Sequence, residues 1–227
     1  MRYHRLPALT LALAMFPAVC FAGLPWSGFD VYGVPCEIKH PANAFGPEDY
    51  NNPVLYLDDK GNVARSDLDV VESIHFTPDV ENLIAGNTGD EPLPDLQYTL
   101  RAFPNHYRAL YSIVRLQLQS RERLPIPPEC WLERGLVYRP NDPNIYLVYG
   151  IYLHRLGMYK KALEKYQRAE SLSEHHNSEI YYNMGLLYLD MNDLEHATAY
   201  ANKAYGLGYP LTGLRNRLSQ RGVSLNR

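Results

Sequence analysis

The chain has 227 residues, of which 46% are hydrophobic and 12% aromatic, and its formal net charge at pH 7 is −3. This length can bury a full core as one domain or as two tightly joined pieces. The mild acidity argues against a general nucleic-acid binder and against a binder of anionic membranes.

The first 22 residues have the order of a bacterial secretory signal peptide. A basic start at 2–5 is followed by an apolar run at 6–16, which is too short to span a bilayer comfortably. Small residues then predict cleavage after Ala22, and with it a periplasmic or secreted protein. Two alternatives remain open. One is an uncleaved N-terminal anchor, and the other is a lipoprotein acylated at Cys20, although Val19 fits a lipoprotein signal poorly.

Cleavage would change the charge and the cysteine count. It would remove Arg2 and Arg5, leaving 20 of the 22 basic residues against 25 acidic ones, a net charge of −5. Of three cysteines, Cys36 and Cys130 would remain, and an oxidising compartment favours a disulfide between them. Two unpaired buried thiols are the alternative. A bridge would close a loop of about 95 residues and contribute up to about 4–5 kcal/mol in the chain-entropy model.

Residues 23–95 are predicted to form an irregular, partly extended region packed on a helical body. Gly, Pro, Asn and Asp recur through 23–64, which is typical of loops. Aromatic side chains are spread through the same stretch, and disordered chains usually lack such anchors. Short extended pieces are expected at Val54–Leu57 and around Val63.

The end of this region has two further signals. The run Leu68–Phe76 is interpreted as a strand, and His75 within it as a packed, hydrogen-bonded residue rather than a catalyst. Thr77 is a typical N-cap and is followed by a proline at the first helical position. A short helix is therefore expected over 78–85, ending at Gly86.

From residue 96 to residue 222 the pattern is helical. Apolar side chains recur at helical spacing, and prolines stand where helices begin or end. The last helix should cap the domain and is followed by a short tail at 223–227. The expected helices are Leu96–Ala102, Tyr107–Ser120, Pro128–Tyr138, two hairpins at 143–176 and 178–209, and a final helix from Pro210 to Gln220 with Leu211, Leu214 and Leu218 facing inward.

The two hairpins repeat each other in sequence. Tyr146-Leu-Val-Tyr-Gly150-Ile-Tyr-Leu153 is answered 35 residues later by Tyr181-Tyr-Asn-Met-Gly185-Leu-Leu-Tyr188. Each glycine is followed by an alanine twelve residues later and by another alanine seven residues after that. These alanines are Ala162 and Ala169 in the first hairpin, and Ala197 and Ala204 in the second.

This pattern, with a period near 34, resembles the tetratricopeptide repeat. The resemblance is specific over 143–209, suggestive over 105–140 and absent before residue 96. Departures from the family pattern are Leu153, Ala201 and the Asn192-Asp193 turn. The resemblance implies a mainly α fold of about three helical hairpins with a C-terminal capping helix, and an extended concave surface used for binding.

The chain as a whole also resembles a group of small exported proteobacterial repeat proteins without assigned activity. Three segments carry that looser likeness: Phe45-Gly-Pro47, His75-Phe-Thr-Pro78 and Phe103-Pro-Asn-His106-Tyr-Arg-Ala109.

Catalytic chemistry has little support in the sequence. The pair His175-His176 is interpreted as a solvated loop, because a metal site needs three or four converging ligands. A thiol nucleophile at Cys36 with His40 as its base would be inert if the cysteine is bridged. There is no phosphate-binding glycine loop, nucleophile elbow or metal-binding Cys-x-x-Cys motif. We therefore expect a non-enzyme without cofactor or metal.

Helix geometry selects the residues that could bind a partner. In the first helix of each hairpin, side chains one step off the packing stripe face the inner wall. Whether that wall is open or filled by residues 23–95 is left open by the sequence. The selected residues are Arg108, Tyr111 and Arg115; Asn144, Leu147, Ile151, His154 and Arg155; and Glu179, Tyr182, Leu186 and Asp190.

These features favour an exported scaffold that binds a protein or peptide, with no nucleic-acid partner and no membrane span after cleavage. The alternative is an assembly or stability subunit of a cell-envelope complex that uses the outer face. An enzyme is the third and least supported class.

Overall fold

The computed structural model describes residues 24, 26–36, 46–174 and 176–225. Within that part of the chain the fold is mainly α, as predicted, with a single two-stranded sheet. The signal-peptide segment 1–22, with Cys20, lies outside the described residues. So do His40, Phe45 and His175.

The helices follow one another along most of the described chain. The strands are β1 (Leu55–Leu57) and β2 (Val63–Ser66). The N-terminal helices are α1 (Asp67–His75), α2 (Pro78–Glu81) and α3 (Leu93–Ala102). The later helices are α4 (Tyr107–Gln119), α5 (Pro128–Tyr138), α6 (Pro143–Arg155), α7 (Tyr159–Leu172), α8 (Ser178–Asp190), α9 (Leu194–Gly206) and α10 (Gly213–Gln220).

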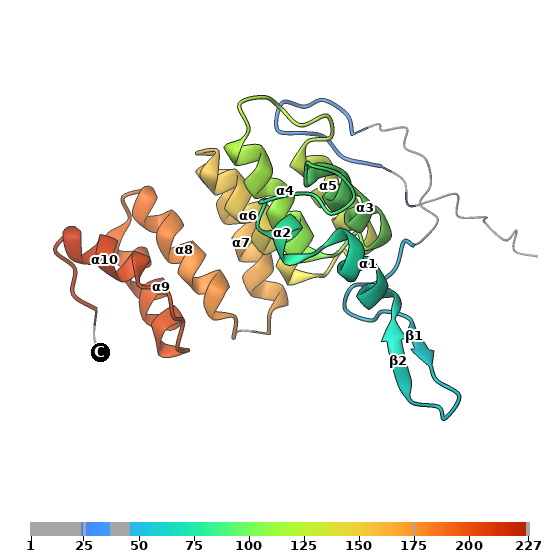
Figure 1. Ribbon diagram of the computed structural model, residues 1–227. Coiled ribbons are helices and arrows are strands. Elements are labelled where there is room, and N and C mark those ends of the chain that lie inside the picture. Colours follow the sequence, from blue (N-terminus) through green and yellow to red (C-terminus); the bar gives the residue numbers. More distant parts are fainter. Residues whose placement is uncertain (1–23, 25, 37–45, 175, 226–227) are drawn as a thin grey trace, which may run out of the picture.

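The later helices stack as hairpins in chain order, and α10 covers the last one (Figure 1). The hairpins are α4–α5, α6–α7 and α8–α9, so both repeats predicted at 143–176 and 178–209 are present. Alanines allow the close approach, because Ala162, Ala169, Ala197 and Ala204 are all fully buried. Leu214 and Leu218 of α10 are also fully buried, which closes the apolar end of the stack.

Capping residues begin the helices at the positions observed. The side chains of Asp142, Asn177 and Asp193 accept hydrogen bonds from backbone N–H groups in the first turns of α6, α8 and α9. Between the paired helices, Gly157 has φ 75° and Asn192 has φ 63°. Asparagine tolerates the left-handed region, so the Asn192 departure from the family pattern preserves the turn that glycine makes in the preceding hairpin.

The strand predicted at Leu68–Phe76 is wrong, because these residues form helix α1. The cause is a capping box just before the apolar run. Ser66 Oγ accepts from Asp69 N at 3.0 Å, and Asp69 Oδ2 accepts from Ser66 N at 2.7 Å. This box supplies partners for N–H groups that a new helix leaves unpaired, so the chain turns helical directly after β2. His75 ends α1 and hydrogen-bonds through Nδ1 to Asp95.

Three predicted helix boundaries also shift. Helix α2 begins at Pro78 as expected but ends at Glu81, because Leu83 adopts φ 61°, outside the helical region. Helix α3 begins at Leu93, three residues early, and α10 begins at Gly213, three residues after Pro210. Leu211 consequently lies before α10 and is exposed rather than buried.

The N-terminal region therefore contains more helix than expected. Helix α1 packs on α3, and α2 contacts both α3 and α4, so this region extends the helical stack at its start. The two extended pieces pair as the antiparallel hairpin β1–β2, which projects beyond α1 (Figure 1).

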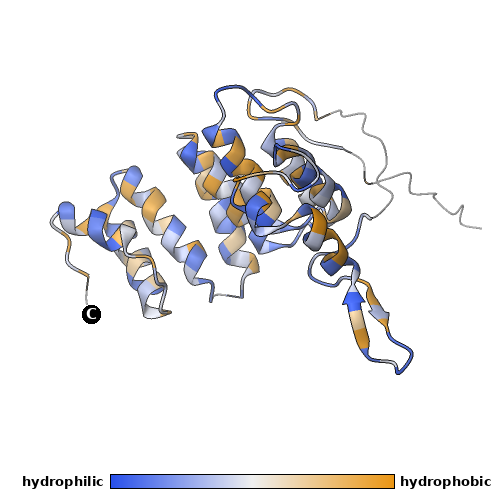
Figure 2. Cartoon of the chain, viewed as in Figure 1, coloured by the Kyte–Doolittle hydropathy of each residue, from blue (hydrophilic) through white to orange (hydrophobic). Residues whose placement is uncertain are grey.

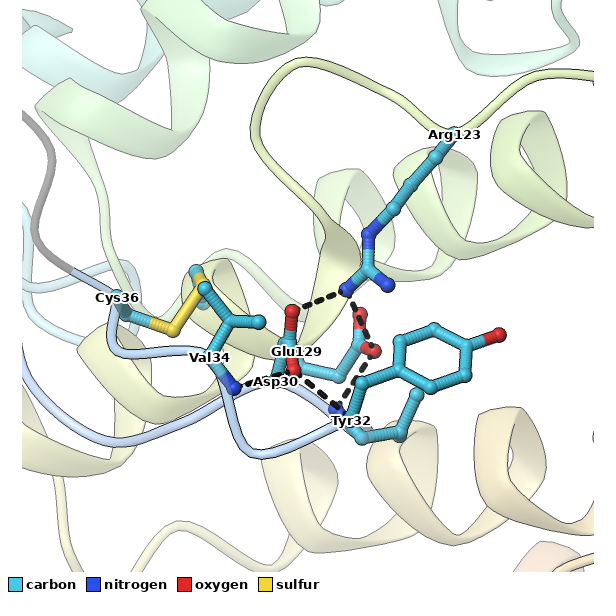
Figure 3. Close-up of a disulfide and its surroundings, with 8 residues drawn as sticks. Asp30, Tyr32, Val34, Cys36, Arg123 and Glu129 are labelled. Carbon is cyan, nitrogen blue, oxygen red and sulfur yellow. Dashed lines mark hydrogen bonds and ion pairs between the residues drawn. A yellow bond between two sulfur atoms is a disulfide. The ribbon is translucent and has the colours of Figure 1, made fainter.

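Residues 26–36 lie against α5 and are fixed there by several contacts. Cys36 and Cys130 form a disulfide, as predicted. Glu129 accepts a hydrogen bond from Val31 N at 3.1 Å, and Arg123 pairs with Asp30 at 2.7 Å (Figure 3). The Trp26 and Trp131 rings pack edge to face with centroids 4.7 Å apart. The bridge thus holds the start of the described chain to the second helix of the α4–α5 hairpin.

The two repeat glycines give a direct test of the packing. A Cβ at Gly150 would lie 2.5 Å from the Tyr166 ring, whereas one at Gly185 would lie 2.5 Å from a Leu214 methyl group. The Tyr166 ring is completely buried between helices and resists displacement. The Leu214 methyl group is the end of a flexible side chain, which can change its rotamer. We expect Gly150→Ala to destabilise the protein by about 1–3 kcal/mol. Gly185→Ala should be near neutral, because alanine favours the helix by about 1 kcal/mol.

Urea denaturation of both variants measures the difference. Equal losses would contradict the unequal packing, and no loss in either variant would place the helix crossings elsewhere.

Candidate binding surface on the inner wall

The inner wall is formed by the first helix of each hairpin, α4, α6 and α8. Its α4 part is partly covered by the N-terminal region. Arg108 donates to both carboxylate oxygens of Glu81, at 2.9 and 2.6 Å, and also pairs with Glu72 at 3.4 Å. Arg115 and Ser112 donate to the Glu81 carbonyl oxygen at 3.3 and 2.9 Å. Arg108 and Arg115 are therefore used to hold α2 in place.

The pKa of the Arg108 guanidinium reflects its pairing with Glu81. The hydrogen bonds and charge of Glu81 raise it above its ordinary value, against the opposing effect of partial burial. A bidentate arginine–carboxylate pair of this kind combines charge with fixed geometry. The sequence left open whether residues 23–95 fill the inner wall. At α4 they fill part of it, because α2 lies against this helix.

Two selected residues belong to the core. Leu147 is only 4% exposed and Tyr182 only 8%. The Tyr182 ring packs on Tyr209 at 4.5 Å between centroids and lies 6.5 Å from Tyr205. The expectation that Tyr182 stands free of the packing is wrong, because the segment joining α9 to α10 folds over it.

Two other selected residues link neighbouring helices. His154 Nε2 of α6 lies 2.9 Å from Asp190 Oδ2 of α8, and Arg217 of α10 pairs with the same carboxylate. Partial burial opposes ionisation of Asp190, but the hydrogen bonds of Arg217 and His154 outweigh it and lower its pKa. This chain of contacts joins α6, α8 and the capping helix along one edge of the wall.

The open part of the wall contains three exposed side chains, one from each first helix. We call Tyr111, Arg155 and Glu179 the inner-wall cluster. Burial raises the pKa of the Tyr166 hydroxyl, Glu179 and Tyr111 add to that rise, and Arg155 opposes it. Arg155 is exposed and makes no hydrogen bond or ion pair to any of the described residues. Half-buried side chains complete this part of the wall: Asn144, Ile151 and Leu186.

Burial affects the titratable groups of this part of the wall. Glu179 is exposed to solvent, yet burial by surrounding protein raises the pKa of its carboxyl group. Tyr166 is completely buried, and its hydroxyl has no hydrogen-bond partner among the described residues. A carboxyl group with a raised pKa and a buried hydroxyl without a hydrogen-bond partner are each features that occur often at functional sites.

The concave region between α5 and α6 has a structural role. It has a volume of about 690 Å³ and lies where α5 meets α6. Its polar groups are already paired, because Asn105 donates to Asp49, Arg139 pairs with Asp49, and Asn51 donates to Asp142. These contacts attach residues 49–51 to the α5–α6 junction.

Two further features of the described part of the chain bear on function. It contains no group of three or more His, Cys, Asp or Glu side chains arranged to hold a metal ion. Nor do its helices include one with the length and apolar content needed to cross a membrane.

Sequence reasoning found the three members of the inner-wall cluster from helical phase alone. It did not predict that Glu72 and Glu81 would pair with Arg108, or that the Tyr166 hydroxyl would be buried without a hydrogen-bond partner among the described residues. No sequence signal could have placed α2 on α4, because that contact depends on how α1 and α3 pack.

The stack of helical hairpins defines a helical-repeat protein. The tetratricopeptide-repeat family model matches residues 178–207, which form the α8–α9 hairpin. The family resemblance predicted from the sequence is confirmed there, and the chain contains a tetratricopeptide repeat. A comparison with curated proteins found no match.

Several solved structures match part of the chain. PilF of Pseudomonas aeruginosa is 16% identical with a TM-score of 0.49, and the match covers 67% of this chain and 64% of PilF. TTC0263, a tetratricopeptide-repeat protein of Thermus thermophilus, is 22% identical with a TM-score of 0.46, over 57% of this chain and 70% of that one. MamA is 16% identical with a TM-score of 0.47, over 67% and 79%.

The link between α8 and the capping helix can be tested by removing one charge. Asp190→Asn should destabilise the protein by about 1 kcal/mol at neutral pH, a charge-assisted contact discounted for solvent exposure. Because the pKa of Asp190 is lower in the folded chain, its contribution is complete above the ordinary value of 3.8 and declines as pH falls through the folded value.

Thermal unfolding across this pH range checks the effect. Glu164→Gln, which removes an exposed charge on α7, is the control and should change stability little at any pH. An Asp190→Asn variant as stable as the parent at neutral pH would show that the capping helix is held by apolar contacts alone.

Proposed function

We propose that this chain is an exported, non-enzymatic scaffold that binds a protein or peptide partner at the inner-wall cluster. The observation that carries the proposal is that Tyr111, Arg155 and Glu179 are exposed, one on the first helix of each hairpin. Stacked helical hairpins commonly bind along such walls. Helix α2 covers α4 at Arg108 and Arg115, so the free part of the wall contains Tyr111 of α4 and extends over α6 and α8.

The chemistry of the cluster favours a polypeptide partner. A tyrosine offers apolar area with a polar tip, and an unpaired arginine can form a bidentate contact with a carboxylate or a backbone carbonyl. Residues of these types dominate the energy of protein interfaces. Glu179 would accept from an amide or a cationic group of the same partner.

Export is supported by the basic, apolar and small residues in succession at 1–22, and a disulfide between Cys36 and Cys130 suits an oxidising compartment. Mass spectrometry of the native protein should show a mature chain that begins at Gly23. A chain that begins at Met1 in the cytoplasm would overturn this part of the proposal.

Binding at the cluster can be tested with the double variant Tyr111→Ala, Arg155→Ala. Both side chains are exposed, so the melting temperature should stay within about 2 °C of the parent, since surface changes cost little. Capture of the partner should fall at least tenfold, about 1.4 kcal/mol or more, because hot-spot truncations cost that much. The control is Lys161→Ala, Gln167→Ala, two exposed positions on α7.

The partner is first captured by photocrosslinking in intact cells from a photoreactive amino acid at position 179. A second variant carries the same amino acid at position 167, on α7. Crosslinks from position 179 that disappear in the Tyr111, Arg155 variant support the inner wall. Crosslinks from position 167 alone would favour the alternative, an assembly subunit of an envelope complex that binds through its outer face.

A further inference from the structure

The β1–β2 hairpin leaves its apolar residues in solvent. Every residue of β1 is exposed, and so are the first three residues of β2. Leu55 is 54% exposed and Leu57 is 61% exposed. Apolar colouring runs along the projecting strands in Figure 2. An isolated two-stranded hairpin is marginal in water, so a third strand would stabilise it.

The backbone direction shows which edge is open. Asp67 N donates to the Val54 carbonyl oxygen at 3.0 Å, and Asp58 N donates to the Asn62 carbonyl oxygen at 2.8 Å. In an antiparallel ladder the direction alternates, so the N–H and C=O groups of Leu55 and Leu57 point away from β2. These four backbone groups form an open edge with no charged side chain or proline within Leu55–Leu57, and the register of the hairpin shifts between Tyr56 and Leu57.

The other edge of the hairpin, along β2, is closed at Ser66. The N–H of Ser66, which points away from β1, already donates to Asp69 Oδ2 at 2.7 Å, and helix α1 begins at the next residue. A strand added to the hairpin can therefore extend along β1 but not along the whole of β2.

We propose that β1 pairs with β1 of a second copy of this chain, forming a four-stranded antiparallel sheet across a two-fold axis at Tyr56. In that register Leu55 of each copy exchanges both backbone hydrogen bonds with Leu57 of the other. The two Tyr56 side chains meet as a non-hydrogen-bonded pair, the closer type of cross-strand pair.

A second copy suits this edge better than an open series of strands. The pairing is self-complementary, as a two-fold contact must be. It places Asp58 opposite Val54 and Lys60 opposite Asn52, so no like charges meet. Because Ser66 N–H is already used and α1 begins at the next residue, the β2 edge is a poorer site for a further strand, which favours four strands over an open series. The dimer would carry two inner walls, and a partner with two binding segments would gain avidity.

Analytical ultracentrifugation of the full chain over a concentration series tests the dimer. Leu55→Pro should weaken it at least tenfold, because proline removes an outward N–H that β2 does not use. Ile84→Ser is the control, since Ile84 is 73% exposed but lies after α2. The Tyr111, Arg155 variant should dimerise like the parent, so this test is independent of partner binding. A parent chain that stays monomeric to about 1 mM, or a dimer unchanged by Leu55→Pro, overturns the proposal.

Cysteine crosslinking tests the register. Tyr56→Cys should form a disulfide-linked dimer under mild oxidation, because the two copies of position 56 face each other on the axis. Leu57→Cys should crosslink at least tenfold more slowly, because its opposite residue is Leu55 of the other copy. Equal rates for the two variants would exclude pairing centred on Tyr56.

Discussion

Each helical hairpin in this chain buries its apolar stripe only by stacking on its neighbours, and the stack depends on small residues where helices cross. Gly150 lets the Tyr166 ring lie directly against α6, and Gly185 admits Leu214 from α10. Ala162 and Ala197 stand at corresponding positions and are completely buried. Interiors are close-packed, so these positions fix the spacing of the helices and hence the shape of the inner wall.

A stack of this kind has two ends, and the chain closes them differently. At the C-terminal end, α10 covers α8 and α9 with two leucines and the Arg217–Asp190 pair. At the N-terminal end, α1 and α3 add a further pair of helices, and α2 bends back onto α4 through Glu81. The disulfide then attaches residues 26–36 to α5, so the N-terminal region is part of the folded body.

These two closures determine where binding chemistry remains. Arg108 of α4 pairs with Glu72 and Glu81, and Tyr182 of α8 is covered by the segment before α10. What is left is a short stretch of wall with Tyr111 of α4, the unpaired Arg155 of α6, and Glu179 of α8, whose carboxyl pKa is raised by burial. The projecting hairpin is a second, independent surface whose open edge is made of backbone groups.

The sequence by itself determined the elements that follow local rules. The 35-residue repetition placed the hairpins α6–α7 and α8–α9, prolines marked where several helices begin or end, and turn-forming residues separated β1 from β2. It failed at Leu68–Phe76, where apolar residues suit a strand and a helix equally and the Ser66–Asp69 capping box decided for the helix. It paired Cys36 with Cys130 because only these two cysteines would remain if the predicted signal peptide were cleaved.

Only the tertiary structure decided which wall residues stay free. Helical phase put Arg108, Arg155 and Tyr182 on the same face, and it cannot distinguish them. Their fates differ because segments distant in sequence reach two of them: α2 pairs with Arg108, and Tyr209 packs on Tyr182, while Arg155 is left in solvent. Contacts of that kind depend on the packing of whole helices, which no periodicity along a single helix records.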